Sequence, residues 1–477
     1  MSHQALDFLF APRSIALVGI TISKPDHWTR TFLDSLLKFR FKGLIYLVNP
    51  RGGEIHGLKV YKSLDDISDE VDYVISTVPA QAALKLVEEC AGKGVRAVHF
   101  CTAGFSETGE EGREGLEAEL AELSRRKGVR IIGPNCMGIY CPDSGLSFSK
   151  DFPKESGSVG FISQSGGNAA DLVRLVMWRG VRFSKVVSYG NACDLNESDF
   201  LEYLGSDPYT KIVALYIEGV KDGRRFRQAL TKIAGEKVII LLKGGTTAGG
   251  ARAVAGHTGA LAGNDAIWDA LCKQLRVIRV HSIDQLADTL VTLSFMDIPR
   301  GRNVALIGVG GGASVLIADE FEKRGLNVPP LPQTIRSYIQ EFTPIAGNIL
   351  RNPIDCLETI TETKSLVRIL DIVSSWSEID FLVGFLRPSQ ASPSLRGVMV
   401  QMVERMLRKS KAVSKPMGVV LEPSILPKEA KEVFSFIQEF VSFKLPVYFS
   451  FSGAADALNL VLNYYESLDN KLRTKPC

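Results

Sequence analysis

The amino-acid sequence predicts an α/β protein built from three Rossmann- or flavodoxin-like parallel-sheet domains in series. Short runs of β-branched residues alternate with longer amphipathic stretches from one end of the chain to the other, a pattern typical of βα units. Two breaks, CPDSGLSFSKDFPKESGS and FMDIPRGRN, interrupt the alternation and have the composition of linkers. The length of 477 residues also exceeds what one ordinary hydrophobic core supports.

The first predicted domain covers residues 1–140 and begins with a strand at Ser14–Val18 and a helix from about His27. Its further elements are predicted as strands at Leu44–Asn49, Val71–Thr77, Arg96–Cys101 and Val129–Ile132, and helices at Gln81–Ala91 and Glu107–Arg126.

The second predicted domain covers residues 156–297, and the third covers residues 301–466. Their buried strands are predicted at Val159–Ser163, Ser184–Ser188, Ile212–Ile217, Val238–Leu242 and Val277–Val280, and at Asn303–Ile307, Phe381–Phe385, Gly418–Leu421 and Val447–Phe451.

The charge balance and the apolar runs exclude several classes of protein. Lys and Arg number 56 against 53 for Asp and Glu, so the net charge of +3 gives no argument for a nucleic-acid or membrane partner. No apolar run reaches the roughly 20 residues that span a bilayer, and the N-terminal residues lack a secretory signal. We therefore expect a soluble cytoplasmic protein.

The eight cysteines are scattered and form no CxxC motif. Cys136 and Cys141 are the closest pair, but no second pair or nearby histidine completes a zinc site. We therefore expect reduced thiols in the core and no metal site. The six histidines are also dispersed, so any histidine chemistry should depend on one residue.

The turns after the strands of the first domain indicate a cleft for an extended ligand. The first strand ends at Gly19 without a G-x-G-x-x-G pattern, which argues against a standard dinucleotide dehydrogenase. Small, Pro- and Gly-rich turns follow the other strands, and Arg51 could supply charge to a phosphate. The turn residues concerned are Asn49, Pro50, Arg51, Val78, Pro79 and Asn135. The alternative is ordinary βα turns without a ligand and a solvated arginine.

Two strand-to-helix turns have the composition of phosphate-binding helix starts. Serines and glycines at the N-terminus of a helix offer hydroxyls and unobstructed amides to an anion. The first turn holds Ser163, Ser165, Gly166 and Gly167, and the second holds Gly310, Gly311 and Gly312. No GK[ST] follows either turn, so neither is a P-loop. Two such turns fit two stations for a moving phosphate, although Ser165 could also be a simple N-cap.

One glycine- and alanine-rich segment, LKGGTTAGGARAVAGHTGALAGNDAIWDAL, contains a single histidine, His257. We predict an irregular loop here, because the glycines are too many for a regular helix or strand. An imidazole on such a loop could act as a base, a metal ligand or a phosphate carrier. Glu218, at the end of a buried strand, is the best acid to orient it, the alternative being an ordinary loop acid.

Several stretches together carry a family resemblance: SIALVG, NP near residue 49, GPNCMGIY, GFISQSGG, SYGNACDLNESDFLEYLGSDP, YIEGVKDGRRF, KGG…GHTGALAG and NPID. From about residue 10 to 460, the chain resembles the α subunit of NDP-forming acyl-CoA synthetases. These include the ADP-forming acetate–CoA ligases and are related to succinyl-CoA synthetase.

The resemblance implies a CoA-binding domain, a ligase domain with a phosphorylated histidine, and a third domain with a second phosphate-binding helix. It places His257 on the phosphohistidine and Glu218 on the glutamate that orients it. In such enzymes an acyl phosphate forms, its phosphoryl group passes to histidine in an exchange that involves CoA, and the phosphohistidine phosphorylates ADP. The direction is reversible.

The resemblance also implies a partner, because the nucleotide is held by an ATP-grasp module that we do not find in the sequence. We expect a separate ATP-grasp β subunit in an α2β2 complex, with ADP or ATP and Mg²⁺ bound through it. The other expected ligands are CoA, phosphate and a small carboxylic acid.

Two departures from the family pattern keep alternatives open. Ile20–Arg30, with its bulky His27 and Trp28, replaces a turn of small residues, and GVGGGAS replaces a turn that usually contains threonine. The alternatives are a non-catalytic CoA- or acyl-CoA-binding regulator and a nucleotide-independent acyl or carbamoyl transferase.

Overall fold

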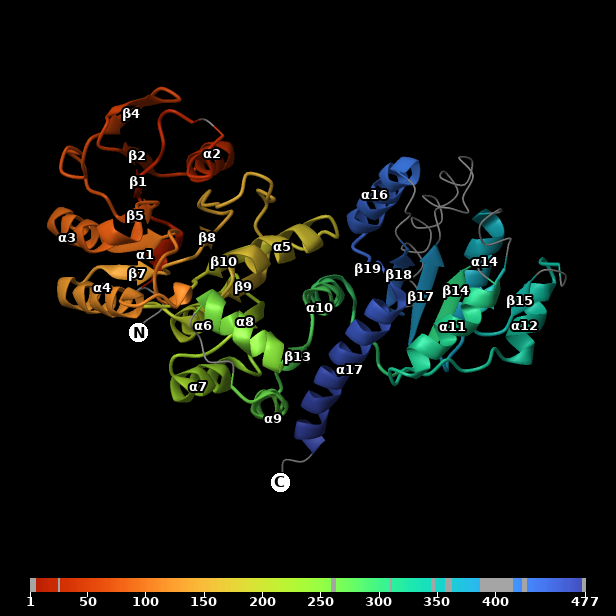
Figure 1. Ribbon diagram of the computed structural model, residues 1–477. Helices are drawn as coiled ribbons and strands as arrows, with labels where there is room; N and C mark the ends of the chain where they lie inside the picture. Colours follow the sequence, from red (N-terminus) through yellow and green to blue (C-terminus); the bar gives the residue numbers. More distant parts are fainter. Residues whose placement is uncertain are drawn as a thin grey trace. The chain divides into compact units, whose positions relative to one another are not determined.

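The structure is a computed structural model, and it describes residues 6–24, 26–258, 263–308, 311–344, 348–356, 363–386, 415–422 and 427–473. Its strands form three sheets, each accompanied by the helices that alternate with it along the chain (Figure 1). By internal contacts the chain divides into two compact units. The first unit is Met1–Arg174 with Arg182–Ile283 and holds two sheets; the second is Leu175–Val181 with Asp284–Cys477 and holds one.

The first sheet has seven strands in the order β3-β4-β2-β1-β5-β6-β7. Apart from β3, which pairs antiparallel with β4, the strands are parallel and follow the order of a dinucleotide-binding sheet. The strands are β1 (Ser14–Val18), β2 (Leu44–Val48), β3 (Gly53–Ile55), β4 (Leu58–Tyr61), β5 (Tyr73–Ser76), β6 (Ala97–Phe100) and β7 (Arg130–Ile132). The helices are α1 (Asp7–Phe10), α2 (Arg30–Phe39), α3 (Ala83–Lys93) and α4 (Arg113–Lys127), with 3₁₀ turns η2 (Ala80–Ala82) and η3 (Ser106–Thr108).

The second sheet has six strands in the order β13-β12-β11-β9-β10-β8. Its parallel strands follow the flavodoxin order, and β8 adds an antiparallel edge. The strands are β8 (Gly138–Tyr140), β9 (Val159–Ser163), β10 (Phe183–Ser188), β11 (Ile212–Ile217), β12 (Val238–Lys243) and β13 (Ile278–Val280). The helices are α5 (Gly166–Met177), α6 (Glu197–Ser206), α7 (Gly223–Ile233), α8 (Ala248–Thr258) and α9 (Asp265–Leu275), followed by α10 (Ile283–Phe295).

The third sheet repeats the flavodoxin order as β15-β16-β14-β17-β18-β19, with β15 antiparallel at the edge. The strands are β14 (Val304–Gly308), β15 (Ile349–Leu350), β16 (Ile354–Asp355), β17 (Phe381–Leu386), β18 (Met417–Leu421) and β19 (Val447–Tyr448). The helices are α11 (Gly311–Glu322), α12 (Gln333–Gln340), α14 (Thr363–Ser374), α16 (Pro427–Ser442) and α17 (Phe451–Arg473).

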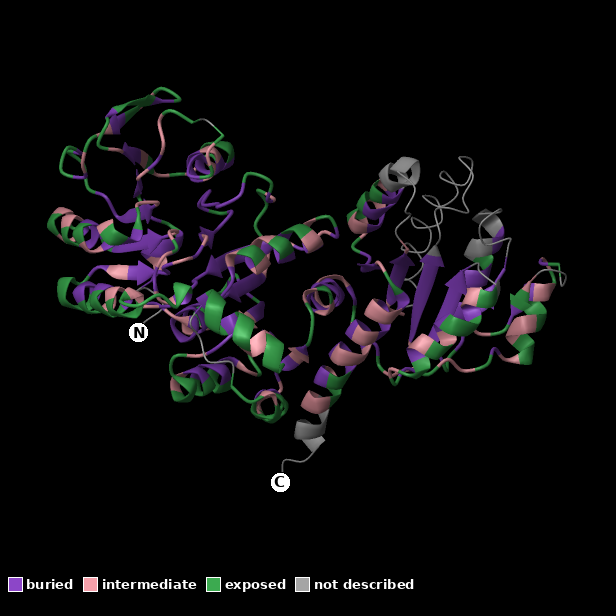
Figure 2. Cartoon of the chain, in the orientation of Figure 1, coloured by how far each residue is buried: buried purple, intermediate pink, exposed green. Residues whose placement is uncertain are grey.

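The central strands are buried from end to end, whereas the helices expose one face (Figure 2). Every residue of β1 and of β9 is buried, which explains why these strands appear in the sequence as continuous apolar runs. The predicted fold of three parallel-sheet α/β domains is confirmed. The additional strands are short and lie at or near sheet edges, where the apolar signal is weak.

None of the helices in the described part of the chain has the length and apolar character needed to cross a membrane.

Candidate functional site

The second sheet brings together two of the predicted site segments. Its strand order reverses between β9 and β11, and ligands of such sheets bind beyond the carboxyl ends of the strands at this point. Strand β9 ends at Ser163 and leads into the serine- and glycine-rich turn, while β11 ends directly before Glu218. Ser163 pairs with Tyr216 across the two strands, so the turn and the acid lie at the same edge of the sheet.

His257 and Glu218 form a direct pair at this edge. The Nδ1 atom of His257 lies 2.9 Å from Oε1 and 3.1 Å from Oε2 of the Glu218 carboxylate. The acid side chain is 2% exposed, whereas the histidine side chain is 49% exposed. Because Nδ1 donates its proton to the carboxylate, the neutral ring keeps its free electron pair on Nε2. The imidazole is therefore arranged as an accessible nucleophile with a buried orienting acid.

Glu218 is held on every side. Its carboxylate also accepts hydrogen bonds from the hydroxyls of Thr258, at 2.7 Å, and Tyr216, at 3.0 Å. Its backbone N–H donates to the side-chain oxygen of Gln164 at 2.8 Å, and its carbonyl accepts from the ammonium of Lys243 at 2.7 Å. A carboxylate buried with this many donors keeps its charge and its orientation.

The electrostatics of the pair follow from these contacts. Burial works to raise the pKa of Glu218, but the hydrogen bonds from His257, Thr258 and Tyr216 outweigh it and hold the pKa below its ordinary value. The hydrogen bond with Glu218 raises the pKa of His257, against the effect of burial, and the charges of Glu218 and Glu107 act in the same upward direction. The pair therefore stabilises a positive charge on the ring.

The predicted irregular loop around His257 is wrong over residues 248–258, which form helix α8. Gly249 and Gly250 lie in the first turn of this helix, and the alanines that follow have the highest intrinsic helix propensity. His257 lies in the last turn, with Val254 and Thr258 as the buried residues. The following Gly259 lies outside the described residues.

The turn Ser163–Gly167 uses its hydroxyls internally. Ser163 donates its hydroxyl to the carbonyl of Ser165 at 2.6 Å, and the hydroxyl of Ser165 accepts from the N–H of Asn168 at 3.3 Å. Ser165 is thus an N-cap of α5, the alternative that its sequence left open. The first amides of α5, at Gly166 and Gly167, have no acceptor within the helix and can serve an anion.

The second predicted phosphate turn lies in the other compact unit. Gly310 is outside the described residues, whereas Gly311 and Gly312 begin helix α11. A side chain added at Gly312 would meet nothing within 4 Å, so its backbone is open to approach.

The predicted CoA turns lie at the carboxyl edge of the first sheet. Gly19 has φ +90°, and a Cβ atom there would lie 3.0 Å from the backbone of Thr77 and of Val78, so the β1 and β5 turns touch. Asn49 donates its side-chain amide to the carbonyl of Ile20 at 2.9 Å and thereby fixes the first turn.

The other residues of this edge surround those turns. Pro50 and Arg51 follow β2 and are exposed, and Pro79 stands at the N-cap of η2. The guanidinium of Arg51 is therefore available to solvent and to a ligand.

The turn that departs from the family pattern is closed by Arg30. Its buried guanidinium donates to the carbonyls of Thr21 at 2.7 Å and Ile22 at 2.9 Å. The Trp28 side chain remains half-exposed, with its ring 5.8 Å from that of His27. An arginine and two aromatic rings therefore occupy a turn that small residues would leave open.

Asn135 differs from the other predicted CoA residues because it contacts the histidine segment. Its side-chain amide donates to the carbonyl of His257 at 3.2 Å and to the side-chain oxygen of Asn191 at 3.4 Å. The Asn191 amide in turn donates to the buried carboxylates of Glu107, at 2.6 Å, and Glu117, at 2.9 Å.

Sequence reasoning missed the supporting residues Tyr216, Thr258, Gln164 and Lys243. The alternation of side chains along a strand places Tyr216 on the same face as Glu218, two residues later, which was the available signal. Lys243 gave no such signal in the sequence, because it simply ends an otherwise apolar strand. In the structure, burial lowers the pKa of Lys243 to about 8, and the nearby charge of Arg279 adds to this effect.

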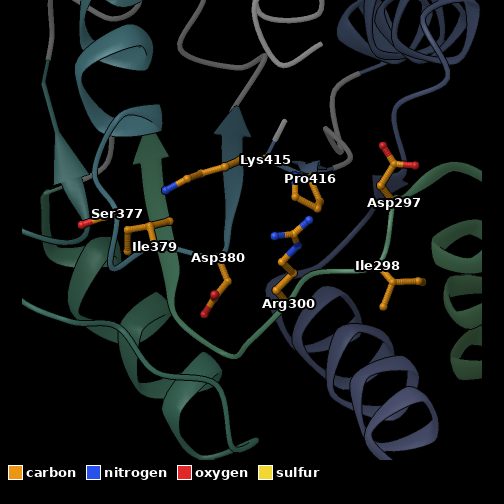
Figure 3. Close-up of a pocket in the computed structure, with 8 residues that line it drawn as sticks. All are labelled: Asp297, Ile298, Arg300, Ser377, Ile379, Asp380, Lys415 and Pro416. Carbon is orange, nitrogen blue, oxygen red and sulfur yellow. The ribbon is translucent and has the colours of Figure 1, made fainter. Parts of the chain in front are cut away.

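A separate cavity of about 410 Å³ lies in the second unit, and none of the residues that line it is a predicted site residue (Figure 3). Asp380 precedes β17, and Lys415 and Pro416 precede β18, so it faces the amino ends of these strands. The remaining lining residues are Asp297, Ile298, Arg300, Ser377 and Ile379. Within the described residues, no group of three or more His, Cys, Asp or Glu side chains could hold a metal ion.

Comparison with known proteins places this geometry in a family. Residues 13–142 match a CoA-binding domain, and residues 156–293 match the flavodoxin-like domain of succinyl-CoA ligases. The α subunit of ADP-forming acetate–CoA ligase II from Pyrococcus furiosus is 35% identical over 431 residues, which cover 90% of this chain and 92% of that protein.

Two further relatives extend the comparison. ADP-forming acetate–CoA ligase I of Archaeoglobus fulgidus is 36% identical over 80% of this chain, which spans only 55% of that protein. The solved dinucleotide-forming acetyl-coenzyme A synthetase 1 of Ca. Korarchaeum cryptofilum, in complex with phosphate and ADP, superposes with a TM-score of 0.80 at 28% identity over 99% of both chains. The chain therefore belongs to the family of ADP-forming acetate–CoA ligase α subunits.

Proposed function

We propose that this chain is the α subunit of an ADP-forming acyl-CoA synthetase in which His257 carries the phosphoryl group. It reversibly converts acyl-CoA, ADP and phosphate into a small carboxylic acid, CoA and ATP. The observation that carries the proposal is the hydrogen bond from His257 Nδ1 to the buried Glu218 carboxylate, because it leaves Nε2 as the accessible nucleophile. A CoA-binding regulator would have no use for this pair.

The reaction divides into three balanced steps. Phosphate displaces CoA from acyl-CoA and gives an acyl phosphate. The Nε2 electron pair of His257 then attacks phosphorus, the bond from phosphorus to the acyl oxygen breaks, and the carboxylate leaves. Finally, ADP attacks phosphohistidine, and the bonding pair returns to Nε2 as ATP forms. Glu218 stabilises the positive charge that develops on the ring, and the Gly166 and Gly167 amides hold the phosphoryl oxygens.

The first predicted domain, residues 1–140, would hold CoA along the carboxyl edge of its sheet. The Gly19 and Val78 turns touch there, and the exposed Arg51 supplies charge for a phosphate of CoA. Residues 156–297 would form the histidine-bearing domain, and residues 301–466 the domain with a second phosphate station at Gly311 and Gly312.

The proposal requires a partner subunit. The chain covers 92% of a relative that is named an α subunit and 55% of the Archaeoglobus fulgidus relative, whose name carries no subunit designation. An α subunit by name acts with another subunit, and this supports a partner. We propose that the partner is a separate ATP-grasp β subunit, which supplies ADP or ATP with Mg²⁺ in an α2β2 complex.

Labelling with radioactive ATP in the presence of the partner subunit tests the proposal. Wild type should acquire a label that is labile in acid and stable in base, as a phosphoramidate is. His257→Ala should acquire none, and Glu218→Gln should be labelled more slowly because the nucleophile remains but its orienting charge is gone.

The exposed His56 provides the matched control, since His56→Ala should be labelled like wild type. Undiminished labelling of His257→Ala, or a label that survives acid, would contradict the assignment.

A further inference from the structure

Three side chains donate hydrogen bonds to the Glu218 carboxylate, and they come from only two elements. His257 and Thr258 are adjacent residues at the end of helix α8. Tyr216 lies instead on β11, the strand that carries Glu218 itself. Any movement that takes the end of α8 away from the sheet removes two donors together and leaves the tyrosine in place.

Tyr216 is fixed where it stands. Its strand pairs with β9 on one side and β12 on the other, with Tyr216 opposite Ser163 and Leu242. A Cβ atom at Gly244 would lie 2.7 Å from the tyrosine hydroxyl, so the chain after β12 packs closely against it. Burial raises the pKa of Tyr216, the charge of Glu218 adds to this, and a side-chain hydrogen bond with Asn168 in the first turn of α5 opposes it. The hydroxyl therefore stays protonated and can donate.

We propose that Tyr216 is a positioning residue that keeps the Glu218 carboxylate oriented while His257 is away from it. The proposal rests on the proposed function, in which His257 accepts a phosphoryl group from acyl phosphate beside Glu218 and passes it to ADP that the partner subunit supplies.

The physical reason is the cost of an unpaired buried charge. The Glu218 side chain is 2% exposed, so its carboxylate is largely removed from water. Without hydrogen-bond donors from the protein, the free-energy cost of this lost hydration would not be offset. Lys243 does not replace them, because its ammonium donates to the backbone carbonyls of Glu218 and Gly244. Only the Tyr216 hydroxyl, among the side-chain donors described, remains to hold Oε1 in the position to which His257 returns.

The step that should depend on Tyr216 is transfer from phosphohistidine to the carboxylic acid. A carboxylate oxygen of the acid attacks phosphorus, the bond from phosphorus to Nε2 breaks, and the bonding pair returns to the ring. The ring must then be hydrogen-bonded through Nδ1 to the Glu218 carboxylate. Acyl phosphate formed in this way then reacts with CoA, releasing phosphate. The extent of labelling by ATP should not depend on Tyr216, because Tyr216→Phe keeps both His257 and the Glu218 carboxylate.

Tyr216→Phe tests the proposal, because it removes one hydroxyl and keeps the ring. The full chain with its partner subunit is phosphorylated by radioactive ATP, freed of nucleotide, and discharged with acetate and CoA in a rapid-quench experiment from pH 5 to 9. We expect full labelling of Tyr216→Phe but discharge slowed roughly tenfold, the effect of losing one hydrogen bond to a charged group. Since a carboxylate that loses a donor has a higher pKa, the acidic limb of the rate should move up by about one pH unit.

Tyr140→Phe is the matched control, since this fully buried tyrosine donates to the carbonyl of Pro153 at 2.6 Å and touches neither member of the pair. Its discharge rate and pH profile should equal those of wild type, and thermal unfolding confirms that both variants fold.

Discharge by Tyr216→Phe at the wild-type rate with an unshifted pH profile would overturn the proposal. Equal slowing in both Tyr→Phe variants would also overturn it, because the effect would then be structural. Neither outcome touches the proposed function, which instead fails if His257→Ala still accepts the label.

Discussion

His99 shows how differently this chain uses its histidines. Its ring is 1% exposed in β6, Nε2 lies 3.1 Å from the carbonyl of Cys136, and Nδ1 has no hydrogen-bond partner. Burial lowers the pKa of this ring to about 4. His257, on the surface of α8 beside a buried acid, has its pKa shifted in the opposite direction. The same residue type is therefore part of the buried core in the first sheet and the proposed nucleophile at the edge of the second.

The His99 shift predicts a pH dependence of stability. Its folded pKa lies below the usual 6.5, so the unfolded chain takes up a proton that the folded chain excludes. The contribution of the neutral His99 ring to the free energy of unfolding is therefore fully present above pH 6.5. It falls by about 1.4 kcal/mol for each pH unit between pH 6.5 and about pH 4. The difference in unfolding free energy between wild type and His99→Gln should shrink accordingly in urea titrations at pH 7.5, 6 and 5. A difference that stays constant over this range would refute the argument.

At the carboxyl edge of the first sheet, Arg51 is expected to make a charge-assisted contact with a phosphate of CoA. Arg51→Ala should weaken CoA binding by about 1–3 kcal/mol in calorimetry, since such contacts are the stronger class of hydrogen bond. Arg126→Ala, at an exposed position on α4, removes the same charge elsewhere on the domain and should leave affinity unchanged. Equal affinity of wild type and Arg51→Ala would rule out the contact.

The sequence predicted some site residues and not others for a physical reason. Glu218 could be found because a charge after an apolar strand is conspicuous, and His257 because it stands among glycines and alanines. Tyr216 carried only the signal of strand alternation, which is weak because an aromatic residue inside such a strand is more often part of the core. Asn135 was assigned to CoA from its turn, and only the fold reveals its contact with the His257 carbonyl.

At the scale of elements, the first two sheets are joined by a strip of backbone hydrogen bonds. The segment after β10 runs along the segment after β7, with bonds from Asn191 to the Pro134 carbonyl and from Cys193 to the Gly133 carbonyl, both 3.0 Å. Gly190, at φ +57°, permits this approach, because a Cβ atom there would lie 2.2 Å from the Pro134 oxygen.

Gly190→Ala should therefore lower the unfolding free energy by at least about 2 kcal/mol, from backbone strain and steric overlap together. Gly94→Ala is the control, because Gly94 also has a positive φ, of +77°, but open space around it. Gly94→Ala should lower the unfolding free energy only by the backbone strain of an alanine at positive φ, about 1 kcal/mol. Denaturant titration of both variants checks this, and equal losses would show that the contact with Pro134 is unimportant.

Helix α8 marks the limit of element prediction from this sequence. The number of glycines predicted a loop. Gly249 and Gly250, however, lie in the first turn of α8, where few backbone hydrogen bonds of the helix have yet formed. The strands of the three sheets were predictable because buried parallel strands form continuous apolar runs. Short strands at or next to a sheet edge, such as β15 and β16 with two residues each, carry too few side chains to leave a pattern.

At the scale of the whole molecule, the chain should act only in a complex. The isolated chain should show no ATP-dependent labelling of His257, because the proposed nucleotide site belongs to the partner. Co-expression with an ATP-grasp subunit should restore labelling, and light scattering should give the mass of an α2β2 assembly. Full activity from the isolated chain would exclude this organisation.

The contact between Asn135 and the His257 carbonyl has a thermodynamic consequence. Asn135 lies in the turn after β7, and its side chain holds the carbonyl of His257 at the end of α8. A ligand that shifts this turn therefore changes the free energy with which the end of α8 docks against it. Reciprocity then requires that docking change the affinity of that ligand by the same factor. The affinity of the chain for CoA with and without a phosphorylated histidine, and the phosphorylation equilibrium with and without CoA, are two measurements of one coupling constant.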